Sequence, residues 1–325
     1  MKGLFLSTAI VLGLGVAALG LAVIFGGPGT PVPMATINDA FMDVDFSGLP
    51  PLSHYATRDG ESLSLRAYPA HPGPAVGSVV LIHGSSASSN SMHVMARSFS
   101  RAGYDVYALD VRGHGASGTR GRIRYIGQLE DDLEDFVRNV APARPRCLAG
   151  FSSGGGFVLR VAGSNRQRLF QSYLLLSPFI SQDALTYRKD NSGWVSVGIP
   201  RFMALTVLNA IGLRSLNDLP VTRFALNKDA KAFLTAEYSY AMSVNFRPNQ
   251  DYIADIKAIR SPCAVVAGDK DEVFYADRFA EVFRSAGKEI SVTLVPETGH
   301  VALTLAPEAV AAAVAAVDSM RKRGV

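Results

Sequence analysis

The sequence is poor in the residues that hold metals or build disulfide frameworks. It contains 2 cysteines and 6 histidines in 325 residues, without a Cys-x-x-Cys pair or a His/Cys spacing typical of a metal site. Cys147 and Cys263 each begin an apolar run that we expect to be a buried strand. Thiols in such strands are mostly small core residues, although two cysteines could also form one disulfide. We therefore predict no metal and no cofactor.

Charged residues are also sparse, at 18% of the chain with a net charge of +4. Because no dense Lys/Arg stripe is interleaved with aromatic residues, nucleic-acid binding is not indicated. One local cluster contains Arg112, Arg120, Arg122 and Arg124. We expect these arginines to lie on a solvated loop. The alternative is that they contact anionic lipid head groups. With 48% hydrophobic residues, the chain is long enough for one large α/β domain with an insertion, or for two small domains.

Charge is absent from residues 4–25, which are apolar apart from Ser7 and Thr8. As a helix this run would be about 33 Å long, enough to cross a hydrocarbon core of about 30 Å. We predict that residues 1–26 form an N-terminal transmembrane anchor. Residues 27–51, which begin with a Gly/Pro-rich stretch, form a linker.

The charges around this run predict its orientation. Lys2 precedes it, whereas the first charges after it are acidic, Asp39, Asp43 and Asp45. The positive-inside tendency places the N-terminus in the cytoplasm and the body on the non-cytoplasmic side of the membrane. The alternative is a cleaved signal peptide and a secreted protein. Signal peptides have a shorter apolar region and a small-residue cleavage site, and this run ends Val-Ile-Phe-Gly-Gly-Pro without one.

The body alternates strand-like and helix-like segments, which indicates βαβ units and a mostly parallel sheet. A hairpin at residues 52–68, with its turn at Asp59-Gly60, precedes the alternation. We predict strands at 78–82, 105–109, 147–151, 171–176, 263–268 and 290–295, and helices at 91–102, 128–140, 276–286 and 303–322. The pattern is interrupted by an irregular, aromatic-rich stretch. We therefore predict a core in two parts, 52–176 and 250–325, with an inserted helical cap at 177–249.

A Gly-x-Ser-x-Gly motif lies at the end of one predicted strand, as Gly150-Phe151-Ser152-Ser153-Gly154. An apolar run precedes it and a helix-like run follows. A sharp strand-to-helix turn of this kind strains the central serine and exposes its hydroxyl above the sheet. The glycines allow backbone segments to approach where a Cβ would clash. The pattern predicts that Ser152 is a nucleophile.

A serine nucleophile needs a base, and the base needs an orienting acid. Two later strand ends carry such groups, Asp271 after the strand at 263–268 and His300 after the strand at 290–295. Active groups collect at these ends in parallel sheets. The order Ser…Asp…His is the one that this motif predicts. Asp269 remains an alternative to Asp271 as the acid.

Taken together, these motifs resemble the α/β-hydrolase superfamily, and most of all its capped monoacylglycerol lipase-like and lysophospholipase-like esterases. The resemblance covers about residues 52–320 and rests on five motifs: His83-Gly84, Asp110-x-Arg112-Gly113-His114-Gly115-x-Ser117, the serine motif, Gly268-x-x-Asp271 and Gly299-His300. It implies an α/β-hydrolase fold, with a mostly parallel sheet flanked by helices. The N-terminal anchor is not typical of these esterases.

The resemblance also implies a role for each site residue. Ser152 attacks the carbonyl carbon, His300 takes the serine proton and returns it to the leaving alcohol, and Asp271 orients the imidazole. Backbone N–H groups of Ser85 and Ser153 form the oxyanion hole.

The expected activity is hydrolysis of a carboxylic ester, lipid-like because a membrane anchor and an apolar cap both favour such substrates. A thioesterase or peptidase on the same triad is one alternative, and a non-catalytic binding module of hydrolase fold is another. We expect His83, His114 and Asp110 to shape loops at strand ends.

Overall fold

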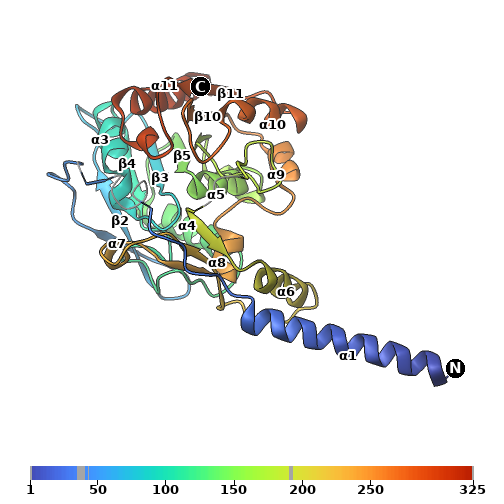
Figure 1. The fold of residues 1–325 in the computed structure, drawn as a ribbon. Coiled ribbons are helices and arrows are strands. Elements are labelled where there is room, and N and C mark those ends of the chain that lie inside the picture. The colour runs from blue at the N-terminus through green and yellow to red at the C-terminus, as the bar shows by residue number, and fades with distance from the viewer. Residues whose placement is uncertain (1, 35–40, 43, 190–192, 324–325) are drawn as a thin grey trace.

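A large sheet forms the centre of the body (Figure 1). The computed structural model describes residues 2–34, 41–42, 44–189 and 193–323, with side chains at all of these except 2–10 and 12. Within these residues the sheet has eight strands in the order β1-β2-β4-β3-β5-β6-β10-β11. The strands are β1 (Ser53–Ala56), β2 (Ser62–Tyr68), β3 (Ser78–Ile82), β4 (Asp105–Leu109), β5 (Arg146–Phe151), β6 (Ser172–Leu176), β10 (Cys263–Gly268) and β11 (Ser291–Val295).

The prediction of a mostly parallel sheet is confirmed. β2 pairs antiparallel with β1 and β4, and all the other neighbouring strands are parallel. β1 and β2 form the predicted hairpin, whose turn places Gly60 at φ +84°, a conformation that glycine adopts without strain. Every residue of β3, β6 and β10 is buried, as expected for strands covered on both faces.

Helices cover both faces of the sheet, because successive strand residues point to opposite sides. Val79 and Leu81 face α3 (His93–Arg101) and α11 (Pro307–Arg323), whereas Val80 and Ile82 face α4 (Gln128–Val140) and α5 (Ser153–Ala162). The remaining helices of the body are α9 (Tyr252–Ala258), α10 (Phe279–Ser285) and the short 3-10 turns η1 (Ser89–Met92), η2 (Asn165–Leu169), η3 (Ala276–Arg278) and η4 (Val301–Thr304). Cys147 and Cys263 are both buried and free, as expected for core thiols.

The segment predicted as a helical cap also contains strands, so that description was incomplete. Its elements are β7 (Val195–Val197), α6 (Ile199–Ala210), β8 (Pro220–Phe224), α7 (Ala230–Phe233), β9 (Glu237–Ser239) and α8 (Tyr240–Asn245). β7, β8 and β9 form a three-stranded antiparallel sheet. Strands of three to five residues are too short for a period-2 pattern to be recognised. Residues 190–192 of this segment lie outside the described residues.

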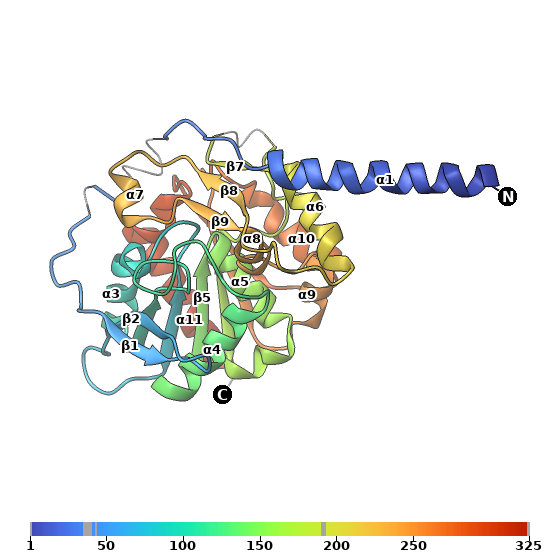
Figure 2. The same cartoon turned by 90° about the horizontal axis from the view of Figure 1, so that it is seen from below.

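At the N-terminus, α1 (Lys2–Phe25) extends away from the body beside α6 (Figures 1 and 2). Arg201 of α6 binds the last turn of α1. The Nε and Nη2 atoms of Arg201 donate to the carbonyl oxygens of Val23 and Ile24 at 2.7 and 2.9 Å. Among the described residues, none of the helices has the length and apolar character needed to span a bilayer. The predicted transmembrane helix is therefore not shown. Of the predicted linker, residues 35–40 and 43 lie outside the description.

Candidate active site

Ser152 occupies the sharp turn between β5 and α5. Its backbone has φ +55° and ψ −119°, a conformation that a residue with a side chain rarely adopts. Its N–H donates to the Leu176 carbonyl oxygen at 2.9 Å, and its carbonyl accepts from Gly156 N–H at 3.0 Å, so the neighbouring chain holds the strained turn. A Cβ on Gly150 would clash with the Gly154 carbonyl oxygen, and one on Gly154 with the carbonyl of His83. The turn therefore needs both glycines.

The structure brings Ser152, His300 and Asp271 into one hydrogen-bonded chain. Nε2 of His300 lies 3.0 Å from Oγ of Ser152, and Nδ1 of His300 lies 2.8 Å from Oδ2 of Asp271. His300 and Asp271 are almost fully buried, whereas Ser152 is half-buried. This geometry allows the imidazole to take a proton from the serine hydroxyl while the carboxylate fixes the other ring nitrogen.

Hydrogen bonds from its own loop hold the Asp271 carboxylate. Oδ1 accepts from the N–H groups of Val273 and Phe274 at 2.8 and 2.9 Å, while Oδ2 faces His300. Burial opposes ionisation, but the imidazole and these hydrogen bonds outweigh it and lower the pKa of Asp271 below its ordinary value. Asp269, the alternative acid, is exposed and is not the partner of His300.

Aromatic rings surround the His300 imidazole. The ring centres of Phe151, Phe274 and Trp194 lie 4.7, 5.2 and 5.8 Å from it. Trp194 belongs to the inserted segment, so this segment contacts the base directly. The backbone N–H of His300 donates to Oε2 of Glu272 at 2.8 Å. Sequence reasoning missed Glu272, whose only signal was its position next to Asp271.

Ser85 and Ser153 meet beside the nucleophile, where their hydroxyl groups share a hydrogen bond. Ser153 is the first residue of α5, so its N–H has no acceptor within the helix and lies at the positive end of the helix dipole. Among the described residues, no hydrogen bond is donated by the backbone N–H of either serine. Both amides are thus available to a substrate oxygen.

The predicted loop-shaping groups lie around these serines. Asp110 accepts from the N–H groups of Ser89 and Ala116 at 2.7 and 2.9 Å, which ties the loops after β3 and β4 together. His83 and His114 are fully buried, with ring centres 4.7 Å apart. Neither touches the Ser152 side chain in the contacts described.

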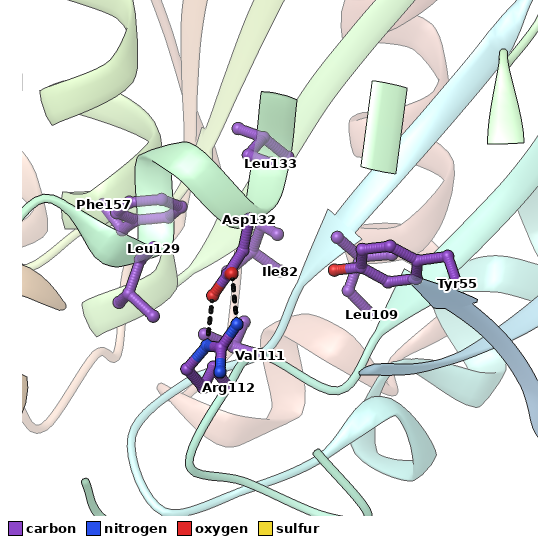
Figure 3. A pocket seen from close by; sticks show the side chains of 9 residues that line it. All are labelled: Tyr55, Ile82, Leu109, Val111, Arg112, Leu129, Asp132, Leu133 and Phe157. Carbon is purple, nitrogen blue, oxygen red and sulfur yellow. Dashed lines mark hydrogen bonds and ion pairs between the residues drawn. The ribbon is translucent and has the colours of Figure 1, made fainter. Parts of the chain in front are cut away.

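The expectation that the arginine cluster forms a solvated loop is wrong for Arg112. Figure 3 shows its guanidinium in a cavity beside α4, with Nε and Nη2 each 2.7 Å from an oxygen of Asp132. Both side chains are buried, and burial raises the pKa of Asp132 to about 6. The other three arginines reach protein acceptors near the surface, namely the Ala232 carbonyl, Asp218 and Asp59. A partner 20 residues away on a helix is not visible in the sequence.

A sheet of this topology, with a serine elbow and an acid and a histidine at later strand ends, defines the α/β-hydrolase class. The model of one family in this class, described as serine aminopeptidase S33, matches residues 73–304. Since the match covers more than half of the chain, the chain belongs to this family, and the fold predicted from the sequence is confirmed.

Individual relatives are more distant. A monoacylglycerol lipase of Mycolicibacterium smegmatis is 42% identical over 88 residues, which are 25% of this chain and 31% of the relative. The match thus spans under a third of that protein. A soluble variant of monoglyceride lipase from Saccharomyces cerevisiae superposes with a TM-score of 0.62 at 19% identity, over 85% of this chain and 96% of its own. A bacterial membrane phospholipase A superposes with a TM-score of 0.60 at 20% identity, over 99% of each chain.

Proposed function

We propose that the protein is a serine hydrolase that cleaves carboxylic esters of lipid-like substrates, such as a monoacylglycerol or a lysophospholipid. The observation that carries the proposal is the continuous hydrogen-bonded chain from Oγ of Ser152 through His300 to Asp271. A serine hydroxyl is a weak nucleophile without an adjacent base, and this chain supplies the base and its orienting acid.

In the proposed reaction Oγ of Ser152 forms a bond to the ester carbonyl carbon while Nε2 of His300 takes the hydroxyl proton. The carbonyl oxygen becomes an oxyanion that accepts from the N–H groups of Ser85 and Ser153. The ester bond then breaks, and His300 gives its proton to the leaving alcohol. Water then attacks the acyl-enzyme while His300 takes a proton from it, and His300 returns this proton to Oγ of Ser152 as the acyl bond breaks. This releases the carboxylic acid and restores the serine.

The relatives support the substrate class. Monoacylglycerol lipases occur among both the sequence matches and the structural matches. The inserted segment places Trp194 against His300, which provides apolar surface beside the reacting atoms. The family description names an aminopeptidase, and amide or thioester cleavage would use the same three residues. Those bonds are therefore included in the test.

The test is activity profiling of the purified full chain against monoacylglycerols, lysophospholipids, short nitrophenyl esters, thioesters and aminoacyl amides. Ser152→Ala should abolish hydrolysis and labelling by a fluorophosphonate probe. Ser98→Ala removes a hydroxyl that donates to the Val94 carbonyl oxygen within α3, away from the catalytic residues, and this variant should retain both hydrolysis and labelling. Full labelling of Ser152→Ala would refute the proposal, and faster cleavage of amides than of esters would refute the substrate class.

We further propose that the chain is tethered to a membrane through residues 4–25, with the N-terminus cytoplasmic and the body on the non-cytoplasmic side. The uncharged run supports this, as does an apolar stripe on α6 beside the end of α1. The stripe consists of Ile199, Met203 and Val207 of α6 and of Ile211 at its C-cap, each 45–68% exposed. Spaced four residues apart, these side chains share one helix face. Sequencing the mature N-terminus tests the tether, because a start beyond residue 26 would indicate a cleaved signal peptide.

A further inference from the structure

The inserted segment forms three hydrogen bonds with Ser86, the residue that follows Ser85. The Ser86 N–H donates to the Tyr238 hydroxyl at 2.6 Å, and the Ser86 hydroxyl donates to the Thr235 carbonyl at 2.6 Å. The Ser86 carbonyl accepts from the Thr235 N–H at 2.8 Å. Each polar group of this buried serine is therefore bonded to residues 235–238, at or just before β9.

Ser86 needs such support because its backbone is strained. Its φ is +66°, in the left-handed region that residues with a side chain rarely occupy. Strained residues persist where surrounding contacts over-determine them, and they gather at functional sites. The three bonds from residues 235–238 are the contacts that hold this one.

Backbone carbonyl oxygens, which can only accept, determine which group donates in the hydrogen bonds of His114 and Tyr238. Nδ1 of His114 faces the carbonyl oxygens of Val111 and Arg112 at 3.2 and 3.3 Å, so Nδ1 carries the proton. Nε2 is then an acceptor, and it lies 2.6 Å from the Tyr238 hydroxyl. Burial lowers the pKa of His114 well below its ordinary value, which keeps the ring neutral. Tyr238 therefore donates to His114, and its oxygen accepts from Ser86.

His83 holds the other side of Ser85. Its Nε2 accepts from the Val111 N–H at 3.2 Å, so Nδ1 carries the proton and donates to the Gly84 carbonyl at 2.8 Å. Each peptide group is planar. The plane before Ser85 is thus fixed through its carbonyl, and the plane after it through the Ser86 N–H. Ser85 has little freedom to turn its own N–H.

We propose that Tyr238 is a positioning residue for the oxyanion hole: its hydroxyl, oriented by His114, holds the Ser85–Ser86 peptide, and together with the His83 contact to the Gly84 carbonyl this fixes the Ser85 backbone and the direction of its N–H. The inference rests on the proposed function, because it needs an oxyanion to form at Ser152. The inserted segment thus supports the oxyanion hole, in addition to providing apolar surface beside His300. Donors held in place before the reaction stabilise a developing charge without reorganisation, so loosening this peptide weakens transition-state binding more than substrate binding.

The experiment compares Tyr238→Phe with Tyr240→Phe. Tyr240 is a buried tyrosine of the same segment whose hydroxyl donates to Oγ1 of Thr206 at 3.1 Å, so both changes remove one buried hydroxyl. With a short nitrophenyl ester, Tyr238→Phe should lower kcat roughly ten- to hundredfold while KM stays within about twofold. The inhibition constant of a trifluoromethyl ketone, which forms an oxyanion on the serine, should rise by the same factor. That of the product carboxylate should not change.

Tyr240→Phe should leave all three constants within about twofold of the wild type. Equal behaviour of the two variants overturns the inference, as does a Tyr238→Phe loss that appears only in KM. If Tyr238→Phe does not fold, His114→Asn removes the Nε2 acceptor that orients the Tyr238 hydroxyl. It should then lower kcat and ketone affinity together by several-fold, and unchanged values overturn the inference. A wild-type protein that hydrolyses nothing in the panel refutes the proposed function instead.

Discussion

The Asp271 carboxylate reaches the His300 imidazole, at 2.8 Å from Oδ2 to Nδ1, across the ends of two adjacent parallel strands. Gly268 ends the first strand, and a Cβ there would clash with the carbonyl oxygen of Thr298 on the second loop. The two loops can therefore approach only because this position is glycine.

The first prediction separates the two acids of this loop. Asp271→Asn keeps the size of the side chain but removes the charge, so the amide no longer favours the imidazole tautomer that accepts the serine proton. We expect kcat for ester hydrolysis to fall by about 10³–10⁴. Asp269→Asn, at an exposed position with the same chemical change, should keep wild-type kcat. Steady-state kinetics on one ester measures both, and similar losses in the two variants would contradict the assignment.

The second prediction concerns pH. His300 must be neutral to accept the serine proton, so kcat/KM should fall on acidification. On the acidic limb of the pH profile, log kcat/KM should fall by one for each pH unit, as expected for a single protonation. Asp271 does not contribute to this limb, because its pKa is lowered and its carboxylate is ionised from pH 5 upwards. Its contribution to stability is complete above its ordinary pKa and is lost only as the pH falls through the lower folded-state value. Kinetics between pH 5 and 9, with unfolding monitored, tests this, and a flat profile contradicts the mechanism.

The sequence predicted the parts of the site that chain order specifies. Ser152, Asp271 and His300 each follow a strand with a clear apolar run, and parallel strands bring such ends to one edge. Tyr238 was visible only as one aromatic residue among many in an irregular segment. Its role depends on a loop 152 residues earlier in the chain. Arg112 was assigned to solvent for the same reason, since its partner comes from another element. Local patterns predict strands, helices and turns, whereas contacts between distant segments depend on how these elements pack.

The third prediction concerns the buried pair Arg112 and Asp132. Arg112 Nη2 also lies 3.1 Å from Oδ1 of Asp59, but its two bonds to Asp132 at 2.7 Å are closer. Breaking a buried ion pair by removing one partner typically costs about 3–5 kcal/mol of folding free energy. Arg112→Met and Asp132→Leu should each destabilise the protein by an amount in this range. The double variant should be more stable than either single variant, because neither charge remains. Urea unfolding measures the three values, and a double variant whose loss equals the sum of the single losses would contradict the coupling.

The last prediction concerns the apolar stripe on α6, and it tests whether the protein binds a membrane surface through this stripe. Met203 and Ile211 are 57% and 68% exposed. They belong to α6 and its C-cap, and α6 lies beside α1 (Figure 2), so a bilayer that contained α1 would lie next to this helix. Met203→Ser with Ile211→Ser should reduce sedimentation with phosphatidylcholine vesicles and slow hydrolysis of vesicle-borne monoacylglycerol. Hydrolysis of a soluble nitrophenyl ester should be unchanged, because neither residue belongs to the catalytic chain. Phe233→Ser, at a 75% exposed residue of α7 away from α1, serves as the control and should bind vesicles like the wild type. Equal loss of binding in the control would mean that general surface hydrophobicity drives the association, and unchanged binding of the double variant would remove α6 from the membrane contact.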